Sequence, residues 1–381
     1  MASAESGEIK RHSVSSRSTE GKALRINLDE RKYGTIAEIG AGQEVARQFF
    51  IAGAAAGTVA KTISAYDMQF SDAIYGIQEG GRYVSKNRVQ AMLEKEFKLV
   101  VDRVGDSRSK SSRFFSYAAT VAAKSFNRDN ECHAWCGLHV QTYPGAPPSE
   151  IIVHVRMLDK TVEQQQESLG ILGVNLIYAG FYLFEDPHKF IDSLTDNLES
   201  ERLEIDSIEF SGPYFEETDN RAINLHLIRS WKTRAIVFEP DGSVVVPADM
   251  LYKKNVLTIR GSFRPVTKLN VDMIEQGSSS FYKLPGVNTD NTVVLAEISI
   301  NDGQGKDLGA SVGDLMERVR LLNALGYSVM VSDYTRYFSL RAYLRRYTKL
   351  QIGIVLGMIN IKQIFDESNY EGVEGLSLIH I

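Results

Sequence analysis

The spacing of apolar residues predicts helices in the first hundred residues of the chain. Val45, Phe49 and Ala52 recur at intervals of three and four residues, and the apolar positions within residues 85–104 keep the same helical period. Past a polar loop at residues 106–113, the pattern changes to that of extended chain. Strands are predicted at residues 114–121, 135–142 and 151–157.

The second half of the chain alternates between the two patterns. A helix is predicted at residues 161–183, and strands follow at 203–210, 234–238 and 256–260. The order then becomes regular, with strand 293–300, helix 312–325, strand 327–331, helix 338–347 and strand 352–356. A β-α-β-α-β order with largely apolar strands predicts a parallel sheet with helices on its faces.

The element order predicts an α/β protein with a mixed or parallel sheet and helices on both faces. At 381 residues, the chain is long enough for at least two subdomains. Residues 276–291, rich in glycine, serine and asparagine, form the expected boundary. We expect an N-terminal α/β domain at residues 31–275 and an incomplete C-terminal β-α-β-α-β unit at residues 292–375.

The two ends of the chain are expected to lie outside these domains. Residues 1–30 begin with a serine-rich stretch and are expected to form a disordered tail. A transit peptide is the alternative, although its acidic residues argue against one. Residues 376–381, Leu-Ser-Leu-Ile-His-Ile, match the translation of a transposon-end sequencing adapter. We therefore expect these residues to be an adapter-derived scar, and the natural chain to continue past Gly375.

Composition indicates a compartment and narrows the range of partners. Two cysteines are too few for a disulfide framework, which indicates a reducing, cytoplasmic location. The net charge of −5 gives no global attraction to nucleic acid or to an anionic membrane. The apolar stretch at residues 49–60 is shorter than the ~20 residues of a membrane-spanning helix, so no membrane association is expected. The composition identifies no cofactor and leaves a homo-oligomer open.

Two glycine-rich turns each lie between a predicted strand and a predicted helix. The turn at residues 40–42 departs from the dinucleotide-binding fingerprint, since the third small residue, Ala46, comes one place late. A turn with tight helix packing is the simpler interpretation there. Gly303 and Gly305 follow a predicted strand at its carboxyl end, where α/β folds bind ligands. They are candidate phosphate-binding residues, with a surface turn as the alternative.

The strongest candidate site is a cluster of cations around a predicted strand-to-helix link. Arginine matches phosphate and carboxylate groups through its fixed fork of donors. Solvated ion pairs with Asp249 and Asp272 are the alternative explanation of these charges. We predict that the cluster binds an anionic small molecule through Lys253, Lys254, Arg260, Ser262, Arg264 and Lys268.

A second cationic stretch mixes arginine with aromatic residues at positions 334–349. Nucleic-acid grooves use such mixtures. A helix that buries its apolar face and covers the rim with arginine stems gives the same pattern. Because the chain is net acidic, we expect no nucleic-acid partner. Asp333 directly follows a predicted buried strand and is therefore a candidate catalytic carboxylate.

Metal-capable side chains concentrate at Cys132, His133, Cys136 and His139. Zinc requires about four ligands in tetrahedral geometry, but the C-x3-C spacing is unusual and no second ligand pair occurs elsewhere. We therefore expect no metal site, and buried cysteines at the start of a strand. His133 remains a candidate catalytic group, although Cys132 and His133 would point to opposite faces of a strand.

Several stretches together resemble a family of cytosolic, mainly bacterial proteins. They are RKYGTIAEIGAGQEVAR (31–47), NECH (130–133), HVRMLD (154–159), LYKK (251–254) and RGSFRPVT (260–267), and the likeness extends from about Arg31 to Gly375. Members often carry the names TonB-dependent receptor or nicotinate-nucleotide adenylyltransferase. The resemblance implies an intracellular α/β protein. Neither named activity is implied, because the chain shows no pattern of amphipathic barrel strands and no His-x-Gly-His element.

Two hypotheses about function follow. The first is an intracellular protein that binds or acts on a phosphorylated metabolite or nucleotide, with nucleotidyl or phospho-group transfer as the corresponding chemistry. The second is a non-catalytic scaffold or regulator whose basic helix at residues 336–349 docks an acidic protein partner.

Overall fold

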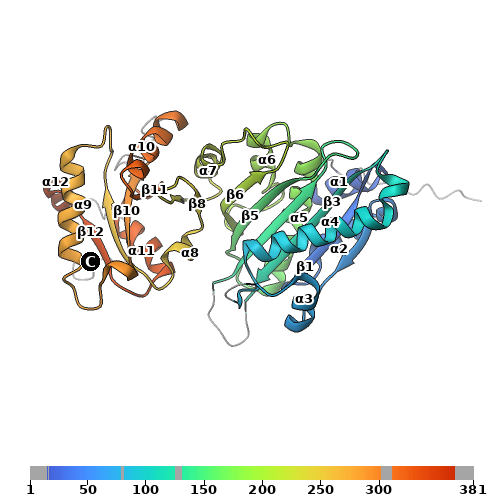
Figure 1. Cartoon of the computed structure of the whole chain (residues 1–381), viewed down its shortest axis with the longest axis horizontal. Coiled ribbons are helices and arrows are strands. Elements are labelled where there is room, and N and C mark those ends of the chain that lie inside the picture. The colour runs from blue at the N-terminus through green and yellow to red at the C-terminus, as the bar shows by residue number, and fades with distance from the viewer. Residues whose placement is uncertain (1–14, 16, 79–80, 125–130, 302–310, 365–381) are drawn as a thin grey trace, which may run out of the picture. The chain divides into compact units, whose positions relative to one another are not determined.

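The computed structural model describes residues 15, 17–78, 81–124, 131–301 and 311–364. The chain forms two compact units, which Figure 1 shows with their elements labelled. The first unit comprises residues 1–203 and 210–217, and the second comprises residues 204–209 and 218–381. There are two mixed six-stranded sheets, so the predicted α/β class with two subdomains is confirmed.

The first sheet has the strand order β2-β1-β3-β4-β5-β6. Strand β1 pairs in parallel with β2 and β3, whereas β3, β4 and β5 form an antiparallel meander. The strands are β1 (Lys32–Ile39), β2 (Val59–Ile63), β3 (Arg113–Ala122), β4 (His133–Val140), β5 (Ser149–Met157) and β6 (Leu203–Ser211). The helices are α1 (Thr19–Asn27), α2 (Glu44–Ala52), α3 (Met68–Tyr75), α4 (Lys86–Arg108), α5 (Val162–Tyr182) and α6 (Pro187–Ser193).

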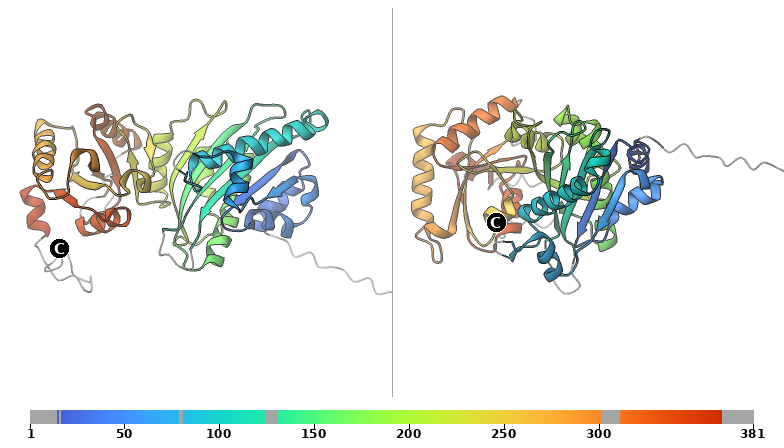
Figure 2. Two further views of the ribbon diagram at one scale, coloured as in Figure 1. Left: turned by 60° about the horizontal axis from the view of Figure 1, so that its bottom comes forward. Right: turned by 45° about the vertical axis from the view of Figure 1, so that its right-hand side comes forward.

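Helices cover both faces of the first sheet. Strand alternation directs Ser116 toward α4, where its hydroxyl donates to the carbonyl of Leu93 at 2.9 Å. The next residue, Tyr117, faces α5, where a side chain at Gly173 would come within 2.9 Å of the tyrosine hydroxyl. In both views of Figure 2, the teal helix α4 lies across the strands.

The second sheet has the order β12-β9-β10-β11-β7-β8. Strands β12, β9, β10 and β11 are parallel, and β7 pairs with β11 in the antiparallel direction. The strands are β7 (Ala235–Phe238), β8 (Val244–Val245), β9 (Asn255–Arg260), β10 (Thr292–Ser299), β11 (Ser328–Ser332) and β12 (Ile352–Val355). The helices are α7 (Asn220–Arg229), α8 (Pro247–Leu251), α9 (Lys268–Phe281), α10 (Val312–Ala324), α11 (Tyr337–Tyr347) and α12 (Met358–Ile364).

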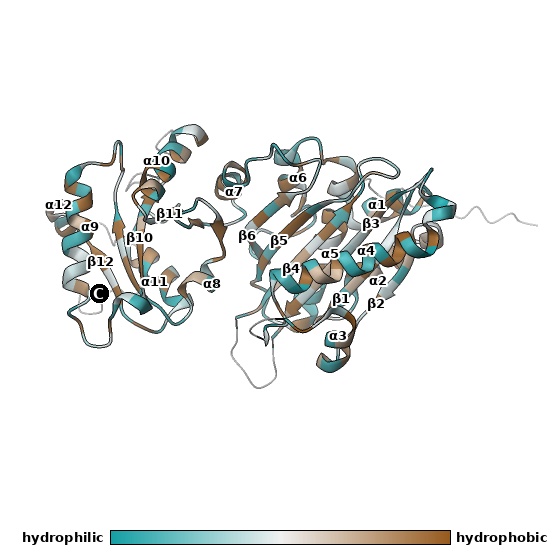
Figure 3. Ribbon diagram, viewed as in Figure 1, coloured by the Kyte–Doolittle hydropathy of each residue, from teal (hydrophilic) through white to brown (hydrophobic). Residues whose placement is uncertain are grey.

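Helices also cover both faces of the second sheet. Val256 of β9 belongs to a buried cluster with Leu251 of α8 and Leu344 of α11. The next residue, Leu257, packs instead with Phe281 of α9. Figure 3 shows apolar colour concentrated on the strands of both sheets. The predicted β-α-β-α-β order is present as β10-α10-β11-α11-β12, with parallel strands.

The prediction of a disordered tail through residue 30 is wrong for residues 19–27, which form helix α1. Ser18 caps this helix, since its hydroxyl accepts from the backbone N–H of Gly21 at 3.0 Å. Ala23 and Ile26 are fully buried. The serine-rich composition of the segment therefore concealed an N-cap and a short apolar stripe.

The expected domain boundary at residues 276–291 does not coincide with the division between the two units. Residues 276–281 are the last part of α9, and β7 and β9 lie in the same sheet as β10, β11 and β12. Glycine serves packing here, because a Cβ atom at Gly277 would lie 2.5 Å from Val355 Cγ2 of β12. Gly277, part of a composition that resembles a linker, is thus explained by the close contact between α9 and β12.

Some predictions fall outside the described residues. The start of the expected tail (residues 1–14 and 16), both candidate glycines Gly303 and Gly305, and the expected scar at residues 376–381 belong to this group. Across the described part of the chain, every helix is too short or too polar to span a bilayer.

The tight contact at Gly277 predicts the effect of Gly277→Ala. An alanine improves helix propensity by up to ~1 kcal/mol, but overpacking against a stiff valine costs about 1–3 kcal/mol. We expect a net loss in the free energy of unfolding, measured by urea titration. Gly105→Ala in α4 is the matched control, since its Cβ would lie 3.6 Å from its nearest neighbour, and it should stabilise. Equal effects of the two variants would contradict the packing explanation.

Candidate functional site

Arg260, the centre of the predicted anion site, is engaged in a buried ion pair. Its Nε lies 2.5 Å from Oε2 of Glu297, and its Nη2 lies 3.0 Å from Oε1. The Glu297 carboxylate, which has no exposed surface, also accepts from the hydroxyl of Ser332 at 2.5 Å. Arg260 therefore neutralises an internal carboxylate.

The remaining donors of Arg260 hold the loop that follows β11. Its Nη2 donates to the carbonyl of Tyr334 at 2.7 Å, and its Nη1 donates to that of Thr335 at 2.9 Å. With these contacts, the guanidinium joins β9, β10 and the loop after β11 at the carboxyl end of the parallel strands.

The structure does not bring the six predicted anion-binding residues together. Lys253 and Lys254 precede β9, whereas Arg260, Ser262 and Arg264 lie at its other end. A strand of this length separates the two groups by roughly 20 Å, at about 3.3 Å per residue. Lys254 donates to the carbonyl of Asp290 at 2.9 Å, and the ammonium of Lys253 lies over the ring of Tyr252. Lys268 is exposed at the first position of α9.

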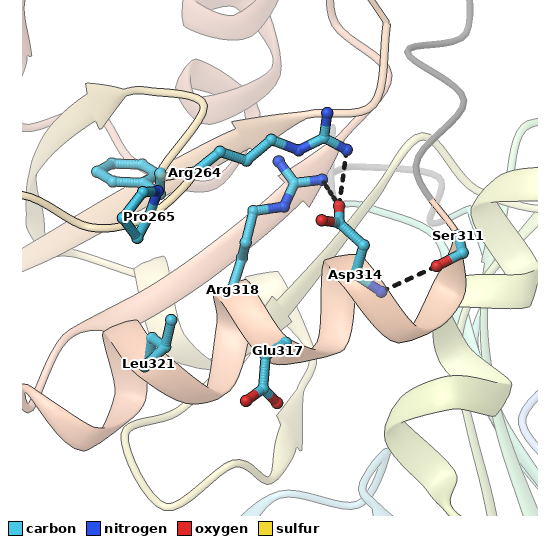
Figure 4. A pocket seen from close by; sticks show the side chains of 8 residues that line it. Arg264, Pro265, Ser311, Asp314, Glu317, Arg318 and Leu321 are labelled. Carbon is cyan, nitrogen blue, oxygen red and sulfur yellow. Dashed lines mark hydrogen bonds and ion pairs between the residues drawn. The ribbon is translucent and has the colours of Figure 1, made fainter.

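A pocket of about 600 Å³ does lie beside Arg264, between the loop that follows β9 and helix α10. Figure 4 shows the side chains that line it. They are Phe263, Arg264, Pro265, Ser311, Asp314, Glu317, Arg318 and Leu321. The helix starts at this pocket, where the Ser311 hydroxyl accepts from the backbone N–H of Asp314 at 3.1 Å.

Two guanidinium groups converge on one carboxylate oxygen in this pocket. Nη2 of Arg264 donates to Oδ2 of Asp314 at 2.7 Å, and Nη2 of Arg318 lies 2.8 Å from the same oxygen. The hydrogen bond from Arg264, together with the charge of Arg318, lowers the pKa of Asp314. The carboxylate is therefore ionised at neutral pH.

Arg318 is the most constrained member of the group. Its side chain is only 5% exposed, and its Nη1 donates to the carbonyl of Ser262 at 2.9 Å. Its Nε is buried and has no hydrogen-bond acceptor among the described residues. Burial lowers the pKa of Arg318, and repulsion by Arg264 acts in the same direction.

The sequence prediction missed Arg318 and Asp314. One signal was present, because Asp314 and Arg318 are four residues apart on a predicted helix. A second signal was the position of Arg318 on the face that Leu315, Val319 and Leu322 bury. A cation on the apolar face of a helix requires a partner or a function.

Asp333 lies just past β11, as predicted, but it is buried in an ion pair. Its Oδ1 accepts from Nε of Arg234 at 2.8 Å, and its Oδ2 accepts from the same atom at 3.1 Å. Burial raises the pKa of Asp333, and Arg234 partly offsets this effect. The structure gives Asp333 a counter-ion from the same unit and no place in the Arg264 pocket.

His133 belongs to the first unit, at the start of β4. Its Nδ1 lies 3.0 Å from Nε2 of His154 on β5, and the His154 ring packs against Trp135 with centroids 4.6 Å apart. His139 instead lies 2.9 Å from the carboxylate of Glu150. Cys136 is buried on the opposite face of β4, which strand alternation requires. Within the described residues, no three histidine, cysteine or acidic side chains form a group that could hold a metal ion.

The turn at residues 40–42 is closed by the protein's own carboxylate. The two oxygens of Glu38 accept from the backbone N–H groups of Val45 and Ala46, each at 3.1 Å, at the start of α2. Glu38 thus occupies the position at which a helix N-terminus would hold a phosphate. Burial raises the pKa of Glu38 to about 7.

The arginine–aromatic stretch at 334–349 forms helix α11, and its rings contribute to the core. Tyr334, Tyr343 and Tyr347 are buried with Leu340 and Leu344. Arg345 caps the end of the helix, where its Nη1 donates to the carbonyl of Leu350 at 2.8 Å. Arginine stems at the rim of a buried helix face therefore account for the pattern.

Breaking the Arg260–Glu297 ion pair should strongly lower the free energy of unfolding. Glu297→Gln keeps the side-chain shape but leaves the Arg260 guanidinium without its counter-charge. We expect the free energy of unfolding to fall by roughly 3–5 kcal/mol, the usual effect of removing one partner of a buried pair. Glu317→Gln, in the exposed Glu317–Arg320 pair, should change it by less than ~0.5 kcal/mol. Urea unfolding compares the two, and a similar loss for both would contradict the structural role.

Glu38 should make stability depend on pH. Its pKa rises from an ordinary value of 4.5 to about 7 on folding, so the folded state binds the proton more tightly. Stability should therefore fall as pH rises through this window, by roughly 3 kcal/mol at ~1.36 kcal/mol per pH unit. Glu38→Gln should remove that slope, whereas Glu163→Gln on the exposed start of α5 should retain it. Unfolding free energies measured between pH 4.5 and 7.5 decide the matter, and an unchanged slope in Glu38→Gln would exclude the assignment.

No protein-family model matches the chain, and no curated protein matches it. Some solved structures do match. The competence/damage inducible protein CihA from Agrobacterium tumefaciens is 15% identical, over 42% of this chain and 94% of that chain, with a TM-score of 0.32. ComA from Klebsiella pneumoniae subsp. pneumoniae MGH 78578 is 12% identical, over 43% and 94%, with a TM-score of 0.33. A CinA superfamily protein from Escherichia coli is 14% identical, over 43% and 88%, with a TM-score of 0.29. Similarity at this level carries no conclusion about the activity of this chain.

Proposed function

We propose that this protein binds a phosphorylated metabolite or a nucleotide in the pocket formed by Arg264, Asp314 and Arg318. The main observation in support of this function is that the positive charges in the pocket are incompletely neutralised. Two guanidinium groups share one carboxylate oxygen, at 2.7 and 2.8 Å, and one of the two is almost completely buried. A buried cation without full compensation is unfavourable, and an added anion relieves it.

The position of the pocket in the fold supports the same function. The pocket lies next to the loop that follows β9 at its carboxyl end, and open α/β sheets bind ligands at this edge. Helix α10 starts in the pocket, and its first N–H groups and its dipole favour an anion there. Arg264 is 42% exposed, so its guanidinium can contact a ligand without leaving the pocket. A volume of about 600 Å³ is within the range of pockets for small molecules.

The proposed function is ligand binding, without a catalytic role for Asp314. The carboxylate nearest to the two guanidinium groups, Asp314, has its pKa lowered by them, so it acts as a counter-ion and not as a proton acceptor near neutral pH. Arginine provides planar, paired donors that match phosphate oxygens.

Arg264→Ala tests the proposal. We expect nucleotides or sugar phosphates to raise the unfolding temperature of the wild-type protein. At a ligand concentration 100 times the Kd, binding contributes about 2.7 kcal/mol to stability. Arg264→Ala should lose this response, because it removes the exposed half of the guanidinium pair.

Arg341→Ala is the matched control, since it removes the same charge from the exposed side of α11. Its thermal-shift response should equal that of the wild-type protein. The proposed function fails if no anion stabilises the wild-type protein. It also fails if Arg264→Ala and Arg341→Ala respond alike.

A further inference from the structure

Asp314 already occupies the place that a ligand oxygen would take. Both guanidinium groups reach the same atom, Oδ2, and the dashed lines in Figure 4 converge on this oxygen. The side chain is 38% exposed, so the resident carboxylate lies at the mouth of the pocket and next to any bound anion. An incoming anion therefore meets two positive charges and one fixed negative charge.

One further negative charge would neutralise the charged side chains of the pocket. Arg264 and Arg318 contribute two positive charges, and Asp314 cancels one of them. Among the described residues that line the pocket, Glu317 is the other ionisable one, and its carboxylate points away from the guanidinium pair in Figure 4. It is paired with Arg320 at the surface. The net charge that the described residues of the pocket present to a ligand is thus close to +1.

A site of this charge discriminates between singly and doubly charged groups. Coulomb attraction to the site increases in proportion to the charge of the ligand. The cost of removing an ion from water increases with the square of its charge, as in Born solvation. A second negative charge on the ligand therefore raises the desolvation cost faster than it raises the attraction to a site whose net charge, with Asp314 included, is close to +1.

Three of the residues that line the pocket are apolar. Leu321 is 41% exposed, Pro265 is also exposed, and Phe263 is buried. Exposed apolar side chains next to a charged group mark a surface that a partly apolar ligand can cover. A pocket of about 600 Å³ also has room for more than a lone phosphate group.

From these observations, and on the basis of the proposed function, we infer that Asp314 determines specificity. The pocket takes a singly charged oxyacid group, either a phosphodiester or a carboxylate, attached to an apolar body. Asp314 lowers the affinity for the doubly charged form of a phosphomonoester, so a phosphorylated metabolite or nucleotide binds best when its terminal phosphate carries a single charge.

The experiment uses probes that differ mainly in charge. At pH 8, phenyl phosphate carries two charges, since its second pKa is about 6, whereas methyl phenyl phosphate carries one. Benzoate is the singly charged carboxylate probe, and it separates the two chemical sources of the charge. Isothermal titration calorimetry measures the Kd of each probe with the full chain. We expect the wild-type protein to bind methyl phenyl phosphate or benzoate more tightly than phenyl phosphate.

Asp314→Asn should reverse the preference. Removing the fixed negative charge should increase affinity by about tenfold per ligand charge, which corresponds to ~1.4 kcal/mol. The affinity ratio of phenyl phosphate to methyl phenyl phosphate should therefore rise by about tenfold. Asp272→Asn makes the same change of side chain at an exposed position of α9 outside the pocket lining, and it should alter this ratio by less than about twofold.

A second measurement needs no variant. Between pH 8 and pH 5.5, phenyl phosphate gains a proton and becomes singly charged, whereas Asp314 stays ionised because its pKa is lowered. The affinity of the wild-type protein for phenyl phosphate should rise over this range, and that for methyl phenyl phosphate should stay constant. This result does not depend on the folding of Asp314→Asn.

The outcomes separate the two proposals. If no probe binds to the wild-type protein or to Asp314→Asn, the proposed function itself is overturned. If the probes bind in a manner that Arg264→Ala abolishes, but neither Asp314→Asn nor the pH change alters the ratio, the specificity role of Asp314 is overturned and the anion pocket remains.

Discussion

The second unit depends on one buried charge, the carboxylate of Glu297. A carboxylate without exposed surface is stable only with a counter-ion and with its oxygens hydrogen-bonded, and Arg260 and Ser332 supply both. The remaining donors of Arg260 hold the carbonyls of Tyr334 and Thr335. A single interaction therefore fixes the ends of β9 and β10 and the loop after β11. It also sets the point from which the loop carrying Arg264 leaves the sheet.

The first unit also contains a buried carboxylate, but its partners are backbone N–H groups and not an arginine. Glu38, at the end of β1, is buried and uses the N–H groups that start α2 as its partners. Its raised pKa shows that these two bonds offset only part of the desolvation. A glycine turn before a helix thus does not imply a phosphate site, because the chain can supply the anion itself. In both units, an internal carboxylate holds the ends of the strands. An anionic ligand therefore has to bind to positive charge that these carboxylates do not neutralise.

Periodicity was sufficient to predict most of the elements and the α/β class, because helical and extended spacing are local properties of the sequence. Periodicity failed to predict elements in which serine or glycine serves as a helix cap or allows a close packing contact. The serines near residue 18 include a helix cap, and the glycine and serine residues of 276–281 lie in a helix whose Gly277 packs closely on Val355. The candidate site was only partly predictable. Arg264 was identified, but proximity in sequence grouped Lys253 and Lys254 with it across the full length of a strand.

Arg260 and Arg264 have the same side chain, and they illustrate how a structural arginine differs from the arginine that we propose binds a ligand. Each guanidinium nitrogen of Arg260 reaches an acceptor of the protein, and two of these acceptors are the oxygens of a carboxylate that it does not share with another arginine. Within the described part of the chain, Arg264 pairs with one carboxylate, which it shares with Arg318, and Nε of Arg318 reaches no acceptor. Sequence alone could not make this distinction, since it depends on how many acceptors the fold places around each cation. Incomplete compensation next to a pocket is the physical property that makes the second arrangement suited to a ligand.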